Sequence, residues 1–478
     1  MKNKLLVIHF IFILIFSSCQ DDVIEINEDL IPNTTLKINR FISDVMNDVY
    51  LWNEFLPQID YTKEEDSEEY FYKLLVEEDR WSFITDDYES LVNSFNGIEK
   101  SFGYSLAFGL FSDSENEVFA VVEFVYPNTP ASNAGLKRGD IIIEINNKVI
   151  TTSNYTDLLF GDQISIQTGV VNFENQEIKP SGIVHNLVAE TLTLNPILLD
   201  TVINYENRKI GYLVYNQFIG SYNSSLDEVF QKFNAAQIDN LVVDLRYNPG
   251  GGIDAARHFC SCIAPQNVVT NSSTLVTYQW NNKYQDYWEE INFDFQLRET
   301  FNAEIPVNLN LDEIHILTGR GTASASELTI TGLQPYMEVT LVGDTTFGKY
   351  VGSLTFRPED LIYESDPDNI YTREYTEDFN NWALQPIVLR YANANGETNF
   401  KNGFAPDFYE EDALIPATPL GEITEPLLKR AIEDITGTGI IAMKKAMLPS
   451  FKLFDRGFSK FDPFKRNLNM GKLKPDHN

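Results

Sequence analysis

The chain has 478 residues, of which 43% are hydrophobic and 13% aromatic, enough for globular domains with buried cores. Its length exceeds that of one ordinary core and predicts two or three domains. The formal net charge of −34 repels phosphate backbones, which argues against a nucleic-acid partner and against a strongly acidic substrate.

The first residues have the order of a secretory signal. In MKNKLLVIHFIFILIFSSCQDD, two lysines precede an unbroken apolar run, which ends in small residues and Cys19. The run is too short and too sharply ended for a stable membrane span. Its end, IFSSC, resembles a bacterial lipobox, in which the cysteine is acylated and becomes the mature N-terminus. We expect a lipoprotein signal peptide over residues 1–18 and a lipid anchor at Cys19. The protein would then lie in the cell envelope, on the periplasmic or the surface side of the outer membrane; secretion without lipid is the alternative.

Two N-terminal segments follow the cysteine. Residues 19–35 are polar and acidic, as is typical of a tether. The segment LKINRFISDVMNDVYLWNEFLPQI then places its apolar residues on one helical stripe, and SEEYFYKLLVEEDRWSFI continues the helical pattern. Residues 36–98 are therefore predicted to form a small helical region.

Residues 99–195 carry short β-type runs and are predicted to form a β-rich module. The order of FGYSL, a strand and NTPASNAGLKRGDIIIEINN resembles a PDZ domain. Gly103 lets the loop turn backbone N–H groups inward as a nest for a terminal carboxylate, and a peptide can add a strand beside it. The peptide-binding residues implied are Phe102, Gly103, Tyr104, Ser105 and Leu106. In the alternative, Gly103 and Gly139 serve only turns and the groove is closed.

Strand-type and helix-type segments alternate over residues 196–435. They are RKIGYLVYNQF, SLDEVFQKFNAAQ, IDNLVVDLRY, a helix after NPGGG, EIHILTG, a helix after TASASE, and EVTLVG. This alternation predicts βαβ units and an α/β core with a mostly parallel sheet covered by helices.

The C-terminal residues 436–478 form a basic tail. Residues 441–478 carry nine Lys/Arg against three Asp/Glu, whereas the rest of the chain is strongly acidic. We expect a solvated extension that folds back on the acidic body or has no fixed structure.

Two cysteines remain after Cys19, so no disulfide framework is expected. Cys260 and Cys262 form a C-x-C beside AARHF, a spacing that suggests a metal site, but no second Cys/His pair follows at ligand spacing. We interpret both as small core residues and expect no metal.

Four motifs carry a further resemblance. LVVDLRYNPGGG, GTASASE, TTFGK and GFAPD (residues 403–407) occur in the order and spacing of the carboxyl-terminal-processing peptidases, also called tail-specific proteases. With the PDZ-like module, the chain resembles this family over about residues 100–435. The resemblance implies a ClpP/crotonase-like core and a serine endopeptidase of proteins or peptides, acting near their C-termini, with no cofactor.

The resemblance implies a Ser–Lys dyad. Ser324 matches the nucleophile and Lys349, 25 residues later, matches the general base. A serine hydroxyl is a poor nucleophile until a base removes its proton. A lysine can do so only as a neutral amine, which requires burial. Ser326 and Thr322 are expected to be capping groups rather than reactants.

The oxyanion hole is expected at backbone N–H groups. The resemblance implies Gly250 or Gly251 of the glycine run and Ala325 after the nucleophile. Many members carry Gln or Glu four residues after the lysine to orient the amine, but here Ser353 occupies that position and can still accept a hydrogen bond.

Histidine offers a different mechanism, since a related core uses Ser–His chemistry. His9 and His477 lie in the signal and the tail, and His185, His258 and His315 are each interpreted as structural. A second interpretation of the whole chain is a non-catalytic protein of the same fold that binds peptides or apolar ligands. Loss of Ser324 or Lys349 would have favoured it, and both are present.

Overall fold

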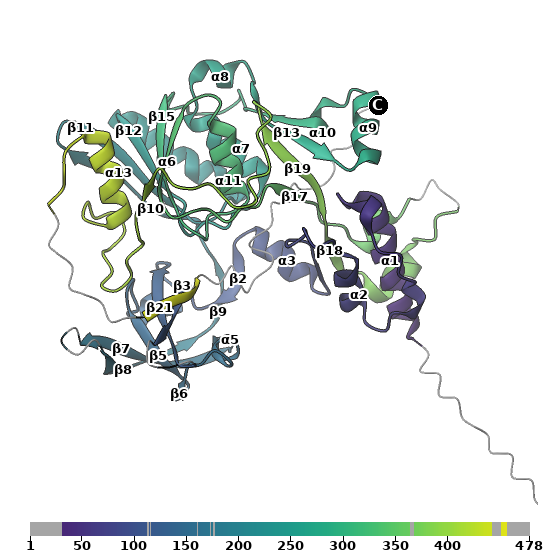
Figure 1. Cartoon of the computed structure of the whole chain (residues 1–478), viewed down its shortest axis with the longest axis horizontal. Helices are drawn as coiled ribbons and strands as arrows, with labels where there is room; N and C mark the ends of the chain where they lie inside the picture. Colours follow the sequence, from purple (N-terminus) through teal and green to yellow (C-terminus); the bar gives the residue numbers. More distant parts are fainter. Residues whose placement is uncertain are drawn as a thin grey trace, which may run out of the picture.

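The computed structural model describes residues 31–441 apart from 112, 113, 115, 160, 173, 175, 176 and 364–367, together with the backbone of the strand 451–456. The chain forms an N-terminal helical region, a β-rich module and an α/β core (Figure 1). This is the predicted fold class. Cys19 and the expected signal peptide lie outside the described residues. Among the helices that are described, none combines the length and the apolar character that crossing a bilayer requires.

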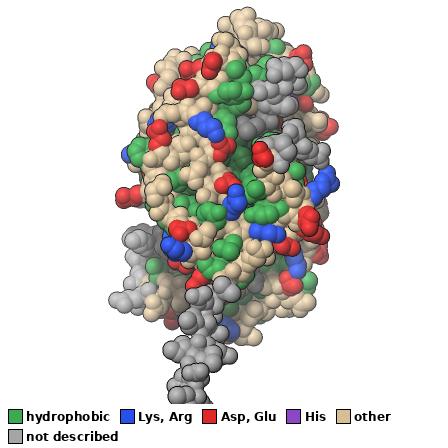
Figure 2. Space-filling view, turned by 90° about the vertical axis from the view of Figure 1, so that its right-hand side faces the viewer, with side chains coloured by type: hydrophobic (Ala, Val, Ile, Leu, Met, Phe, Trp, Pro, Cys, Tyr) green, Lys and Arg blue, Asp and Glu red, His purple; other side chains and the backbone are tan. Residues whose placement is uncertain are grey.

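The N-terminal region is joined to the core rather than separate from it. Its elements are α1 (Asn33–Val49), α2 (Ser67–Leu74), β1 (Phe83–Thr85) and α3 (Tyr88–Phe95), with 3₁₀ turns at Asn53–Phe55 and Tyr61–Lys63. α1 begins three residues before the predicted start and buries Phe41, Ile42 and Val45 in the same hydrophobic cluster as the core. β1 pairs with β18 (Ala383–Gln385) of the core. Figure 2 shows the face of the molecule at the right of Figure 1, where acidic, basic and hydrophobic side chains are interspersed.

The β-rich module is built on one antiparallel sheet in the order β21-β3-β4-β5-β7-β8. Its elements are β3 (Tyr104–Phe111), β4 (Val118–Val125), α4 (Pro130–Asn133), β5 (Ile141–Ile145), β6 (Lys148–Val149), α5 (Tyr155–Leu159), β7 (Gln163–Asn172), β8 (Glu177–Val188) and β21 (Phe451–Arg456). β2 (Ile98–Ser101) and β9 (Glu190–Thr193) pair with each other where the chain enters and leaves the module. Leu106, Val122 and Ile142 are among the residues that fill its separate hydrophobic core.

The edge of β3 is occupied by the protein's own tail. β21 pairs antiparallel with β3, and Phe451 lies opposite Phe111 and Arg456 opposite Ala107. Part of the basic tail therefore folds back on the body, which is the first of the two expected outcomes. It does so as a strand, which the sequence did not indicate.

The core sheet has the order β10-β11-β12-β15-β16-β20, with β10 antiparallel and the other strands parallel. The strands are β10 (Ile197–Tyr205), β11 (Arg208–Tyr215), β12 (Asn240–Asp244), β15 (Glu313–Thr318), β16 (Glu338–Gly343) and β20 (Phe408–Tyr409). The helices are α6 (Asn223–Ala236), α7 (Ile253–Ile263), α8 (Gln266–Thr270), α11 (Ala325–Leu333) and α13 (Pro426–Thr436). Every strand and helix predicted for the core by the alternating pattern is present.

Both faces of this sheet are buried, as a parallel sheet requires. Leu241 and Val243 of β12 pack on the side of α6 and α7, whereas Val242 packs on the side of α13. A second antiparallel sheet, in the order β14-β13-β19-β17, flanks the core. Its strands are β13 (Thr274–Trp280), β14 (Arg298–Thr300), β17 (Val351–Ser353) and β19 (Ile387–Asn393). α9 (Asn282–Glu290) and α10 (Asp294–Leu297) contact β13, and α12 (Arg373–Thr376) lies between β17 and β18 in the chain.

Three adjacent parallel strands lead into the motifs. β12 runs into the glycine run, β15 into the serine turn and β16 into the lysine turn. Because the carboxyl ends of parallel strands meet at one edge of the sheet, these three loops converge there.

Candidate active site

Ser324 lies at a strained turn between β15 and α11. It is the N-cap residue of α11 and has φ 59° and ψ −113°, a conformation that costs a non-glycine residue about 1–3 kcal/mol. Its side chain is fully buried, and among the described residues its Oγ has no hydrogen-bond partner. Such strained positions cluster at functional sites, and a buried hydroxyl without a partner is available to a reaction.

The Glu327 carboxylate ties the serine turn to the lysine turn. Its Oε2 accepts hydrogen bonds from the backbone N–H groups of Ser324 (2.9 Å) and Lys349 (2.8 Å). Its Oε1 accepts from the Thr346 hydroxyl and the Gly348 N–H, both at 2.6 Å. Burial raises the pKa of Glu327 to about 7, although these four donors lower it.

Lys349 lies in a tightly braced turn and is fully buried. Gly348 has φ 96°, and a Cβ there would lie 2.4 Å from the Lys401 carbonyl oxygen, so only glycine fits. The GFAPD motif supports the turn, because Phe404 N–H donates to the Thr346 hydroxyl at 2.7 Å and the Asp407 carboxylate accepts from Leu341 N–H at 2.8 Å. A buried lysine with a fixed backbone is the arrangement that a lysine base needs.

The glycine run lies directly against the serine turn. A Cβ on Gly250 would lie 2.7 Å from the Ser324 Cβ and 2.9 Å from the Ala325 nitrogen. Gly250 N–H donates to the Asn248 side chain at 2.8 Å, so that donor is already engaged. Of the three predicted oxyanion-hole residues, Gly251 and Ala325 therefore remain the better candidates for donors, with Gly250 providing close approach.

Neither neighbouring hydroxyl of the serine motif is placed as a nucleophile. Ser326 Oγ donates to the Asn248 carbonyl at 3.1 Å, and Thr322 Oγ1 donates to the Leu245 carbonyl at 2.8 Å. They anchor the glycine run to the serine turn rather than cap α11, which corrects the predicted role. The capping group at this helix is the Glu327 side chain, bonded to Ser324 N–H.

Tyr391 and Gln385, which lie outside the four motifs, also contact the candidate site. The Tyr391 hydroxyl, from β19, donates to the carbonyl of Lys349 (2.8 Å) and lies 3.3 Å from that of Ser324. Gln385 Nε2, from β18, donates to the Ser353 Oγ at 3.1 Å, and both residues are fully buried. Sequence reasoning missed Tyr391 and Gln385, which lie far along the chain, and it also missed Glu327, although S-x-x-E at Ser324–Glu327 is a capping-box pattern that could have revealed it.

The described histidines have structural partners elsewhere. His315 Nε2 lies 3.0 Å from Asp434, His258 Nε2 lies 2.8 Å from Asp227, and His185 Nδ1 lies 2.8 Å from the Ala134 carbonyl. His9 and His477 lie outside the described residues.

The predicted peptide-binding loop faces the core across a cavity of about 700 Å³. Phe102, Tyr104 and Ser105 line it, together with Pro249 of the glycine run and Gly321 of the serine turn. Gly103 adopts φ 78°, and its N–H donates to the Ser101 hydroxyl at 3.3 Å. Leu106 is buried in the core of the module and does not line the cavity, so its side chain supports the loop, and the peptide-binding role of these five residues stays a prediction.

Models of known families match three parts of the chain. The model of peptidase family S41 matches residues 209–409, that of the peptidase S41 N-terminal domain matches residues 37–83, and that of a PDZ domain matches residues 121–164.

Individual relatives are distant. The carboxyl-terminal-processing protease of Synechocystis is 24% identical over 334 residues, which cover 67% of this chain and 66% of the relative. The carboxy-terminal processing protease CtpB of Bacillus subtilis is 24% identical over 265 residues, or 55% of this chain and 48% of the relative. The chain thus spans about half to two thirds of the length of these relatives.

The fold is also similar to a solved structure from Bacteroides fragilis, provisionally named an S41 protease. The two structures align with a TM-score of 0.65 and 26% sequence identity, and the alignment covers 83% of this chain and 97% of the other. Together with the three family models, it identifies a protein of peptidase family S41 with a PDZ domain.

Proposed function

We propose that the protein is a serine endopeptidase that cleaves proteins or peptides through an acyl-enzyme. The observation that carries the proposal is the buried, strained Ser324, whose turn is held to that of Lys349 by one carboxylate. The kinship with carboxyl-terminal-processing proteases supports the same reaction.

The chemistry follows from the positions of the groups. Burial disfavours an ammonium, so the Lys349 amine can act as a neutral base and take the Ser324 proton as Oγ attacks a peptide carbonyl. The N–H groups of Gly251 and Ala325 would stabilise the oxyanion that develops. Lysine would then return the proton to the leaving amine, and water would hydrolyse the acyl-enzyme by the reverse sequence.

Ser353 would orient the lysine amine in place of a longer side chain. Its Oγ already accepts a hydrogen bond from Gln385, which gives the short serine a fixed direction. Gln385 is thus a positioning residue, acting through Ser353.

The PDZ domain would present the substrate. The cavity between its loop and the core has a volume of about 700 Å³, in the range of ligand-binding pockets, and is lined by the loop and by Pro249, directly before the three glycines. Cleavage near a substrate C-terminus would follow if the loop holds the terminal carboxylate.

The test is cleavage of a reporter peptide with a free apolar C-terminus. Ser324→Ala should abolish turnover, whereas Ser326→Ala, two residues along the same helix start, should retain most of it. Both variants must melt as the wild type does. Absence of turnover by the wild type with a panel of such peptides, combined with tight binding of those peptides, would favour a non-catalytic peptide-binding protein instead.

We also propose that Cys19 is lipidated and anchors the protein in the cell envelope, in the outer membrane. The support is the order of charged, apolar and small residues before the cysteine. Cys19→Ala should move the protein from the membrane to the soluble fraction, and a mature wild-type chain with a free, unacylated N-terminus would contradict the proposal.

A further inference from the structure

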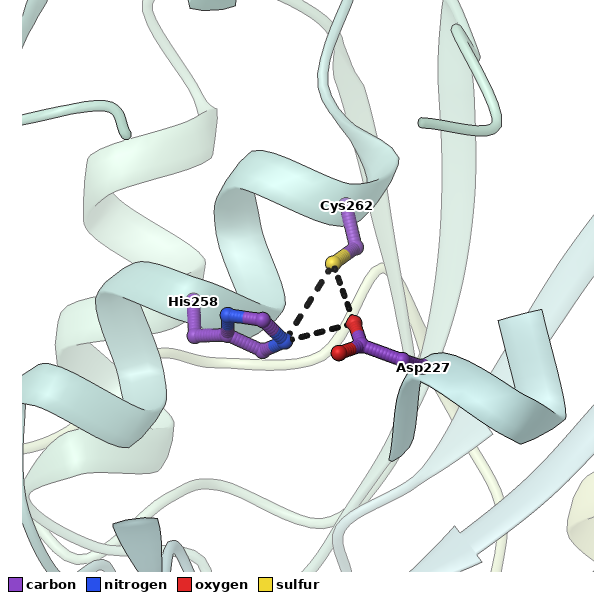
Figure 3. Close-up of side chains that lie close together, drawn as sticks. All are labelled: Asp227, His258 and Cys262. Atoms are coloured by element: carbon purple, nitrogen blue, oxygen red, sulfur yellow. Dashed lines mark hydrogen bonds and ion pairs between the residues drawn. The ribbon is translucent and has the colours of Figure 1, made fainter. Parts of the chain in front are cut away.

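A side-chain cluster between two core helices, α6 and α7, has no part in the proposed reaction. Asp227 projects from α6, and His258 and Cys262 project from one face of α7, toward a common point (Figure 3). His258 and Cys262 are four residues apart, a spacing that stacks two side chains on one face of a helix. Among the described residues, this is the group of three His, Cys or carboxylate side chains whose donor atoms gather closely enough to hold a metal ion.

The separations of the donor atoms match a metal site. His258 Nε2 lies 2.8 Å from Asp227 Oδ1, and Cys262 Sγ lies 3.7 Å from that nitrogen and 3.8 Å from that oxygen. A point equidistant from three atoms at these separations is about 2.0 Å from each, close to the bond lengths of zinc to nitrogen and oxygen and slightly shorter than zinc to sulfur. A small displacement of the ion from the plane of the three atoms lengthens all three bonds.

The exposure of the three side chains and the chemistry of their donor atoms also favour a metal site. The side chains of His258 and Asp227 are 13% and 15% exposed, so an ion can enter, whereas Cys262 is buried and holds its sulfur inward. One thiolate, one imidazole and one carboxylate form a donor set of mixed softness, which suits Zn²⁺ better than the oxygen-seeking Mg²⁺ or Ca²⁺.

We propose that Asp227, His258 and Cys262 bind a zinc ion, with water as the fourth ligand. Binding displaces the thiol proton and leaves the imidazole neutral. The ion would join α6 to α7, and α7 begins at Ile253, immediately after the glycine run. Zinc would therefore stabilise the helix that follows the proposed oxyanion hole. The ligands lie on α6 and α7 and Ser324 at the start of α11, so this site is distinct from the dyad, and the proposal does not depend on the peptidase activity.

The sequence alone did not reveal this cluster. The C-x-C spacing drew attention to Cys260 and Cys262 together, but Asp227 lies 31 residues before His258 and on another helix. Cys260 is fully buried, and its thiol bonds to Thr329 of α11, on a different side of α7 from the cluster. This makes Cys260 a matched control on the same helix.

The experiment uses the full chain treated with a chelator and then titrated with Zn²⁺ alone. We expect one high-affinity ion per chain and a rise in Tm of about 3–5 °C at a hundredfold excess over Kd. Cys262→Ser and His258→Gln should each raise Kd at least about tenfold. Cys260→Ser should bind as the wild type does.

Cobalt supplies a spectroscopic readout that a merely structural ion pair would not give. Co²⁺ in the wild type should show a thiolate charge-transfer band and the intense visible bands of a four-coordinate ion. The charge-transfer band should vanish in Cys262→Ser and persist in Cys260→Ser. If Cys262→Ser fails to fold, His258→Gln and Asp227→Asn, at partly exposed positions, serve in its place. Wild-type zinc affinity in these variants, or no stoichiometric binding by the wild type, would overturn the proposal.

Discussion

A hydrogen bond and a close packing contact hold the backbone of Ser324 in its strained conformation. Glu327 accepts from its N–H, and Gly250 packs against its Cβ at a distance that a larger residue would not permit. The same carboxylate fixes the Lys349 backbone, so the two residues of the proposed dyad are positioned through their main chains without any substrate.

Replacing Lys349 tests the proposed base. Lys349→Ala should lower kcat at least about 1000-fold, and the double variant with Ser324→Ala should be no less active than either single variant, because the two residues act as a unit. Lys349→Arg should also fail, since a guanidinium stays protonated. Lys401→Ala, at an exposed lysine of the neighbouring loop, is the control for lost charge. Near-normal peptide cleavage by Lys349→Ala, with loss of cleavage in His258→Ala or His315→Ala, would require a histidine mechanism instead.

Glu327 should give the stability of the protein a specific pH dependence. Burial raises its pKa from 4.5 to about 7, so the folded state binds this proton more tightly than the unfolded state does. The free energy of unfolding should therefore fall as pH rises from about 4.5 to 7, by about 3 kcal/mol from this group.

Glu327→Gln should remove that part of the slope in urea unfolding measured across the same pH range. The substitution should also destabilise the protein by about 2–6 kcal/mol, because the NH₂ group of the new glutamine would face two hydrogen-bond donors that then lose their acceptor. Glu290→Gln, at an exposed position, should leave the slope unchanged. An unchanged slope in Glu327→Gln would mean that another group titrates.

At the scale of elements, the core was predictable and its flanking sheet was not. The run from β11 to β16 alternates clearly between strand and helix patterns, and each loop motif follows its strand directly. β13, β17 and β19 are short segments separated by long stretches of chain, and their pairing depends on contacts more than 30 residues apart in sequence. Tyr391 reaches the site on β19 and Gln385 on β18, just before it in the chain, which is why no local pattern could reveal them.

The strand β21 should compete with peptides for the PDZ domain. It pairs with β3 from Ala107 to Phe111, along the edge to which an added peptide strand would bind. A tethered competitor acts at a high effective concentration, so its removal should strengthen peptide binding.

Two truncated chains form the matched pair for this prediction. A chain ending at residue 441 should bind a peptide with a free apolar C-terminus about tenfold more tightly than a chain ending at residue 456, which keeps the strand. Amidating the peptide should weaken binding to the shorter chain, because the loop would lose the terminal charge. Equal affinities of the two chains, measured by fluorescence anisotropy, would show that β21 does not cover the peptide site.

At the scale of the whole molecule, a buried ionic network joins the PDZ domain to the α/β core. Arg138, in the PDZ domain, bonds to the Asp412 carboxylate at 2.6 Å and to the Tyr247 hydroxyl at 2.5 Å. Arg246 bonds to the same Asp412 oxygen at 3.0 Å and to Glu425 at 2.7 Å. Since Arg246 lies four residues before Gly250, the orientation of the PDZ domain is linked to the loop proposed as the oxyanion hole.

Breaking this network should lower the free energy of unfolding far more than breaking a surface ion pair does. Arg138 and Asp412 have side chains that are only 8% and 7% exposed, so removing one partner leaves a buried charge poorly compensated. Arg138→Met and Asp412→Asn should each lower the free energy of unfolding by about 3–5 kcal/mol, and the double variant should lose less than the sum. The matched control is Lys100 with Asp162, whose side chains are 54% and 76% exposed, and whose coupling should stay below about 1 kcal/mol. Double-mutant cycles from urea unfolding measure both couplings. If the buried pair couples no more strongly than the exposed pair, the network does not hold the two domains together. The link from the PDZ domain to the glycine run would then be the contact between the rings of Phe124 and Tyr247, whose centroids lie 5.2 Å apart.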